Sequence, residues 1–322
     1  MAVGARPQGG WPPGPTASTP GFETAATVVQ RLAVLLEAGV APPSAWQHAA
    51  SGVDSPVAAA VAAGIVERGA VGRDLVEHLL AARALAVPGE QQAWAALAAA
   101  WLVATESGAP LGPTLRRFAE VLRSLAQARR DVEVALAGPV ATARIVLALP
   151  AVGLLFGMLL GFDALRIVTT TPAGWACLVV GSLLVLGGIR WNRRLIRAAR
   201  VLDATPGLGL ELLAIAVAGG ASLDRAQALV DRMLVEADLP PLDDGAEQVM
   251  AFSRAAGVPA AALLHAEAEE CRRVAQAAGQ RRAVELGIRL LLPLGVCILP
   301  AFIALGVAPI VLSIVSSTAA AI

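Results

Sequence analysis

Three long runs of apolar residues dominate the hydrophobic pattern of this chain. Ile145–Phe162 and Ile167–Ile189 follow one another with little more than Asp163 and Arg166 between them, and Leu290–Ile314 lies near the end of the chain. A helix rises 1.5 Å per residue, so runs of this length cross a hydrocarbon core of roughly 30 Å. The pattern therefore predicts three transmembrane helices, and the short connection makes the first two an antiparallel hairpin.

Outside these runs, apolar residues recur with the period of amphipathic helices. The first such stretch carries Val28, Leu32 and Leu35 inward and ends at Gly39, and the last one before the hairpin starts near Leu111. Glycine, proline and Ser-Pro signals divide this segment into six helices with no convincing strand. After the hairpin, the same signals predict helices over 202–219, 223–236, 246–256 and 260–282.

The two helical segments resemble each other. Gly39–Ala45 matches Gly220–Ala226, each after an apolar helix, and Ser107–Pro110 matches Ala256–Pro259. The spacing behind these motifs stays constant, and each copy then enters an apolar run that contains proline. A constant offset with the same element order predicts an internal duplication whose second copy is shortened. The residues matched at constant offset are Ala119, Glu120, Arg123, Ala126 and Gln127 with Ala268, Glu269, Arg272, Ala275 and Gln276.

The positive charges predict which side of the membrane each segment occupies. All 25 basic residues are Arg, and the apolar runs are flanked by several of them, whereas the hairpin loop balances Arg166 with Asp163. Apart from the cluster after the hairpin, the flanking residues are Arg129, Arg130 and Arg144 before the first run and Arg281, Arg282 and Arg289 before the third. The positive-inside rule then puts both helical segments and the N-terminus in the cytoplasm and the C-terminus outside. We expect the cluster after the hairpin to anchor the chain on anionic lipid, with a specific ligand as the alternative. This cluster contains Arg190, Arg193, Arg194, Arg197 and Arg200.

Together these patterns predict an all-α integral membrane protein with two cytoplasmic helical-bundle repeats and three transmembrane helices. Residues 1–21 are rich in Pro and Gly and contain no apolar signal-peptide core, so we expect a disordered tail. The other predicted parts are a first helical domain over 22–140, a hairpin over 145–189 with spans at 145–162 and 167–189, a shortened second helical domain over 190–287, a third span over 288–316, and a tail over 317–322.

Small residues give the predicted spans faces on which helix backbones approach closely. Gly153, Gly157 and Gly161 stand at every fourth position of the first span, and Cys177 and Gly181 form a small face on the second. Such faces favour packing within the hairpin, and the alternative is a seam for a dimer or a pilin helix. The spans carry no central ionisable residue of the kind that ion-coupled transporters use.

The composition predicts neither catalytic chemistry nor a bound cofactor. A chain without Lys has no Walker A lysine, no Schiff-base lysine and no Ser-Lys dyad. His265 and Glu269 share a helix face, and we interpret them as a solvated surface pair because no second His stands near enough for a metal site. The net charge of +0 gives no electrostatic argument for nucleic acid. We therefore expect no enzyme, no cofactor and no metal site.

The order of helical domain, two spans, second helical domain and final span resembles the type II secretion system F-domain proteins. This family includes the platform proteins of type IV pili and the membrane proteins of tight-adherence pili. Its Glu-x-Gly motif before the last long helix resembles Glu106 and Gly108, and Gly257 stands in the matching place of the second copy. The family's glycine before Pro or Ser at a helix start is similar to Gly39 and Gly220. The resemblance extends over about 24–314.

The resemblance implies a membrane platform, or scaffold, that couples a cytoplasmic assembly ATPase to pilin subunits in the inner membrane of a bacterial cell. Expected partners are the secretion or pilus assembly ATPase, prepilin subunits, the lipid bilayer, further copies of this chain and a second, similar platform protein. The competing hypothesis is a membrane subunit of a transporter or permease. The candidate ATPase-docking face, on the polar side of the long helix before the first span, contains Arg116, Arg117, Glu120, Arg123 and Arg130.

Overall fold

The computed structural model describes residues 21–70, 72–87, 89–159, 171–200, 205–242, 245–308 and 311. Every regular element in these residues is a helix, and three helices are long and apolar enough to cross a membrane. The expectation of an all-α membrane protein is therefore confirmed. Internal contacts divide the chain into two units. The first unit combines the residues up to Arg130 with Asp203–Val274, and the second combines Asp131–Leu202 with the residues from Ala275 onward.

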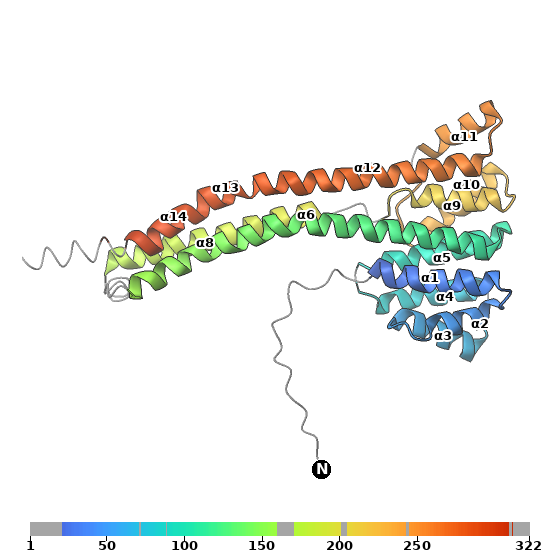
Figure 1. Ribbon diagram of the computed structural model, residues 1–322, viewed down its shortest axis with the longest axis horizontal. Coiled ribbons are helices and arrows are strands. Elements are labelled where there is room, and N and C mark those ends of the chain that lie inside the picture. Colours follow the sequence, from blue (N-terminus) through green and yellow to red (C-terminus); the bar gives the residue numbers. More distant parts are fainter. Residues whose placement is uncertain are drawn as a thin grey trace, which may run out of the picture. The chain divides into compact units, whose positions relative to one another are not determined.

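The first unit begins with the six helices that the sequence predicts. Residue types at their ends explain several boundaries: the Ser55 hydroxyl accepts a hydrogen bond from the backbone N–H of Ala58 at 3.2 Å, and Gly108 ends a helix in the left-handed conformation with φ 78°. The helices are α1 (Gly21–Glu37), α2 (Pro42–Ala50), α3 (Pro56–Arg68), α4 (Arg73–Ala82), α5 (Gln91–Ser107) and α6 (Leu111–Leu159), with the short 3₁₀ helix η1 (Arg83–Leu85) after α4 (Figure 1).

The long helix α6 carries both polar and strongly apolar sequence. It is continuous from Leu111 to Leu159 although Pro139 and Pro150 lie inside it. A proline removes one backbone hydrogen bond, and a long helix with packed neighbours tolerates that loss. The predicted change from helical domain to membrane span, at 140–145, thus falls within one helix.

The second copy of the repeat contains four helices in the described residues. They are α9 (Leu208–Ala218), α10 (Leu223–Glu236), α11 (Gly245–Ala256) and α12 (Ala260–Arg289). Helices α9 and α10 flank Gly220 as α1 and α2 flank Gly39, and α11 and α12 flank Gly257 as α5 and α6 flank Gly108. Within the described part of the second copy, nothing corresponds to α3 and α4.

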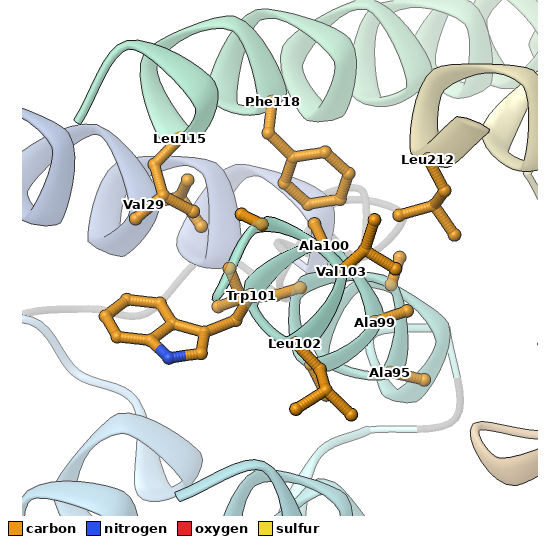
Figure 2. Packing of buried hydrophobic residues seen from close by; sticks show 14 of the residues in the cluster. Val29, Ala95, Ala99, Ala100, Trp101, Leu102, Val103, Leu115, Phe118 and Leu212 are labelled. Carbon is orange, nitrogen blue, oxygen red and sulfur yellow. The ribbon is translucent and has the colours of Figure 1, made fainter. Parts of the chain in front are cut away.

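Helix α5 forms the centre of the first unit. Its residues from Ala93 to Ala104 are all buried, as expected for a helix that is apolar on every side. Figure 2 shows α5 surrounded by Val29 of α1, Phe118 of α6 and Leu212 of α9. The indole rings of Trp101 on α5 and Trp46 on α2 lie 5.8 Å apart between centroids.

Both copies of the repeat contribute to this one hydrophobic core. Helix α9 packs against α5 and α10, and α10 also packs against α5. Leu210 and Leu213 of α9 are 1% and 0% exposed and belong to the same cluster of buried residues as Leu97 and Leu122. We expected one helical domain before the hairpin and another after it, and in the structure the two segments share a core.

The second unit is built around the apolar helices. Helix α8 (Pro172–Arg200) lies beside the segment after α12, which consists of α13 (Leu291–Pro293), η2 (Leu294–Ile298), α14 (Leu299–Phe302) and η3 (Ile303–Val307) (Figure 1). The elements η2 and η3 are π-helical turns. Pro293 and Pro300 lack an N–H, so they interrupt the regular hydrogen-bond ladder and wider turns form next to them.

Helix α6 and the C-terminal helices run in the same direction within the second unit. Gln276 donates a hydrogen bond to Asp131 at 2.6 Å, and further along both segments Phe302 lies against Gly153. Since residue numbers rise together along the two segments, their orientation is parallel.

Candidate functional site

The two copies of the repeat meet where α5 and α9 end. A Cβ added to Gly219 would lie 2.6 Å from the backbone oxygen of Ser107, and a Cβ on Gly108 would lie 3.7 Å from the backbone oxygen of Gly219. Only glycine permits so close an approach of two backbones. Two motifs that are far apart in the sequence, around Gly108 and around Gly220, therefore lie against each other in the first unit.

A buried carboxylate also joins the two copies. Glu211 of α9 is 1% exposed, and one of its oxygens lies 2.9 Å from Nε of Arg117 on α6. Two residues of α12 complete the arrangement, because Nδ1 of His265 lies 2.8 Å and Nη1 of Arg272 lies 3.5 Å from the carboxylate. We call these four residues the Glu211 cluster. It connects the long helix of the first copy to both α9 and α12 of the second.

The surroundings keep Glu211 ionised. Burial raises the pKa of the Glu211 carboxyl, but the hydrogen bond and charge of His265 and the charges of Arg272 and Arg117 outweigh burial, so its pKa lies below the ordinary value of 4.5. Two acceptors 2.8 Å apart would repel each other, so Nδ1 of His265 carries a hydrogen that it donates to Glu211. Nε of Arg117, which also lies 3.0 Å from that Nδ1, then donates to the carboxylate.

Further ion pairs surround the contact between the copies. Glu106, at the end of α5, accepts from Arg232 of α10 at 2.8 Å, and Glu236 of α10 accepts from Arg73 of α4 at 3.2 Å. All four side chains are partly exposed, so each pair contributes little to stability on its own. Together these two pairs fix the orientation of α10, and with it the second copy, on the first copy.

The candidate ATPase-docking face is largely engaged in contacts within the first unit. Arg116 pairs with Glu37 of α1, Arg117 belongs to the Glu211 cluster, and Arg130 pairs with Glu23 of α1. Glu120 and Arg123 are exposed, and none of the ion pairs among the described residues includes them.

The residues that carry the family motifs serve mainly as helix ends. Gly39, Gly108, Gly220 and Gly257 have φ values of 83°, 78°, 92° and 68°, a left-handed conformation that glycine adopts at helix C-termini. Glu106 is the exception, because its carboxylate reaches Arg232 in the second copy.

The predicted small faces of the spans meet the C-terminal helices in the second unit. A Cβ on Gly153 would lie 2.7 Å from the ring of Phe302, and a Cβ on Gly181 would overlap the side chain of Leu305. Cys177 is partly buried. Gly157 lies on α6 but its surroundings are not described, and Gly161 lies outside the described residues.

Gly188 makes a contact that we did not predict. A Cβ at this position would lie 2.8 Å from Cδ1 of Ile298. Gly181 stands seven residues before Gly188, and Leu305 stands seven residues after Ile298, so the two segments are antiparallel. The seven-residue spacing of Gly181 and Gly188 was the available signal in the sequence.

The arginine cluster that was predicted after the hairpin lies within the last turns of α8. Arg190, Arg193, Arg194 and Arg197 are exposed, and Nε of Arg197 donates to the backbone oxygen of Arg193 at 3.3 Å. Arg200 is the last residue of the helix, and its side chain is not described.

We did not expect a role for Glu211 from the sequence. The sequence feature that could have indicated this role is that Glu211 is the one acidic residue in the otherwise apolar helix Leu208–Ala218. His265 was expected to pair with Glu269 on the surface, but its ring turns to Glu211 instead. Within the described residues, no group of three His, Cys, Asp or Glu side chains could hold a metal ion. The Glu211 cluster connects α6, α9 and α12 through ion pairs.

Comparison with known families identifies the first copy. Residues 28–159 match the family model described as type II secretion system (T2SS), protein F. The chain carries a type II secretion system F domain. This F domain extends from α1 to the end of α6, so it contains the first copy of the repeat together with the first span. No curated protein and no solved structure matches the chain.

Proposed function

We propose that this protein is the inner-membrane platform of a pilus-assembly or type II-like secretion machine, and that it couples a cytoplasmic assembly ATPase to pilin subunits. The observation that carries the proposal is the F domain, which continues through α6 from a soluble bundle into a membrane span. One continuous helix gives a displacement of the bundle a direct route into the bilayer. The tight-adherence type of machine is the form that the layout of the chain favours.

The proposed orientation has both copies of the repeat and the N-terminus in the cytoplasm and the C-terminus outside. The parallel course of α6 and the C-terminal helices supports it, because both copies then enter the membrane from the same side. The antiparallel course of α8 supports it too, since α8 returns the chain to that side. The arginines of α8 stand at the end that this orientation puts in the cytoplasm.

The docking of the ATPase is proposed for the free part of the candidate face. Glu120 and Arg123 are exposed on α6 and outside the ion pairs of the described residues, whereas Arg116, Arg117 and Arg130 hold the bundle together. Reversing the charge of the paired arginines would test the fold and not the docking.

The test is co-purification of the assembly ATPase with a variant that carries both Glu120→Arg and Arg123→Glu. We expect about a tenfold loss of the recovered ATPase, as for the removal of one or two charged interface contacts. Arg254→Glu is the control, because Arg254 is also exposed but belongs to another helix, α11. Unchanged recovery with the double variant would rule out this docking face.

A further inference from the structure

A pocket of about 480 Å³ lies between α6 and α8 in the second unit. It is found where the apolar run of α6 begins and that of α8 ends, at the level of the proposed cytoplasmic surface of the membrane. Its walls come from Val140, Arg144 and Leu147 of α6 and from Ile189, Asn192, Arg193, Ile196 and Arg197 of α8.

Three positive charges from two different helices converge on this pocket. Arg144 belongs to α6, whereas Arg193 and Arg197 stand one turn apart on α8. All three are exposed, and no ion pair among the described residues neutralises any of them. Guanidinium groups that share a pocket without a carboxylate favour an anion with several acceptor oxygens, and phosphate is such an anion, since arginine binds it through paired, charge-assisted hydrogen bonds.

An unsatisfied polar group lies in the same wall. Asn192 is 3% exposed, and its side-chain oxygen has no hydrogen-bond partner within the described part of the chain. A buried acceptor without a partner is unfavourable, and a turn of the Asn192 side chain toward the pocket would let a hydroxyl group there satisfy it.

The apolar wall decides between a free anion and a lipid. Val140, Leu147, Ile189 and Ile196 line the same pocket as the three arginines, and Leu147 and Ile189 belong to the apolar runs that cross the membrane. Inorganic phosphate gains nothing from such a wall, whereas a phospholipid fits both parts, with its phosphate at the arginines and its acyl chains along the apolar helices.

We propose that this pocket binds the headgroup of an anionic phospholipid that carries a hydroxyl group, such as phosphatidylglycerol. We call it the headgroup pocket. Arg144, Arg193 and Arg197 hold the phosphate, and Asn192 accepts the hydroxyl. The bound lipid then bridges α6 and α8 at the edge of the bilayer. Its phosphate lies between the positively charged side chains of the two helices.

This proposal differs from a diffuse attraction between arginines and an anionic membrane. In a diffuse attraction every arginine near the surface contributes alike. In the headgroup pocket, Arg144, Arg193 and Arg197 contribute, and Arg190 and Arg194 do not, although these two are exposed on the same helix.

The test measures binding of phosphatidylglycerol to the full chain in mild detergent by native mass spectrometry. We expect Arg144→Gln, Arg193→Gln and Arg197→Gln each to weaken binding by roughly tenfold, the usual effect of losing one charge-assisted hydrogen bond. Arg190→Gln and Arg194→Gln are the matched controls and should leave binding within about twofold of the unchanged chain. Circular dichroism on the same samples checks that every variant keeps its helices.

Three results would overturn the proposal. The first is an equal loss in the pocket variants and the controls, which means diffuse attraction. The second is displacement of the lipid by millimolar inorganic phosphate, which means that the site recognises the free anion. The third is binding of phosphatidylcholine as tight as that of phosphatidylglycerol, which means that the charge of the headgroup is not recognised.

Discussion

Glu211 shows how burial changes the importance of an ion pair. Its carboxylate is 1% exposed and is shared by Arg117, His265 and Arg272, whereas the side chain of Glu106 is 36% exposed and meets only Arg232 among the charged groups described. An exposed pair adds at most about 1 kcal/mol, but removing one partner of a buried pair leaves uncompensated charge in the interior. The two glutamates therefore form a natural comparison at the contact between the copies.

Replacing the buried carboxylate should destabilise the first unit clearly. We expect Glu211→Gln to lower the free energy of unfolding by about 2–3 kcal/mol, at or just below the lower end for breaking a buried pair, because Arg117 remains partly exposed. Glu106→Gln is the control and should lower it by less than about 1 kcal/mol. Denaturant unfolding in mild detergent, followed by circular dichroism, gives both values. Equal effects of the two substitutions would mean that the Glu211 cluster is not a buried charge site.

The same residue makes stability depend on pH in a defined direction. The pKa of Glu211 is lower in the folded chain than its ordinary value of 4.5. Its stabilising contribution is therefore fully present above pH 4.5 and is lost as the pH falls from there through the lower folded pKa. The unfolding midpoint of the unchanged chain should drop more steeply below pH 4.5 than that of Glu211→Gln, in parallel thermal scans. Parallel pH profiles of the two proteins would contradict the assignment.

At the scale of the elements, the second unit depends on small residues that face large ones. Gly181 meets Leu305 and Gly188 meets Ile298, while a Cβ added to Gly187, next to Gly188, would have no atom of another described helix within 4 Å. Helices in a bilayer associate through such close packing. Lipid tails are as apolar as the side chains, so no hydrophobic effect drives the helices together.

Filling one of these small positions should loosen the packing of α8. Gly181→Val forces the added methyl groups into Leu305 and should lower stability by about 1–3 kcal/mol, as overpacking of a tight contact does. Gly187→Val provides the control at an open position of the same helix and should change stability by less than about 0.5 kcal/mol. The measurement is the thermal unfolding midpoint in mild detergent. A Gly181→Val chain as stable as the Gly187→Val chain would show that this face is not packed against Leu305.

How well the elements could be predicted depended on where their signals lie. The six helices of the first copy were predictable because Gly and Pro mark their ends and because α5 is apolar on every side. The shared core of the two copies was not, because nothing in the apolar surface of α9 tells whether it covers its own copy or the other one. The partners of Arg116, Arg117 and Arg130 were hidden for the same reason, since all of them lie on other helices.

At the scale of the whole molecule, the account requires both copies of the repeat to lie on one side of the membrane. In a chain whose three cysteines are replaced by Ser, Glu269→Cys puts a thiol on the exposed side of α12, and Trp175→Cys puts one at the opposite end of the spans. A membrane-impermeant maleimide should label residue 175 in cells with a permeabilised outer membrane, and residue 269 only after the inner membrane is opened. The reverse pattern would invert the proposed orientation.

The proteins that bind this chain in the cell decide whether it is the platform of an assembly machine. The most direct measurement is affinity purification of the tagged chain from its own cells in mild detergent, with mass spectrometry of the proteins that accompany it. The account predicts a secretion-type assembly ATPase or a prepilin among them. A nucleotide-binding cassette subunit or a soluble solute-binding protein in their place would contradict the account and favour a transporter.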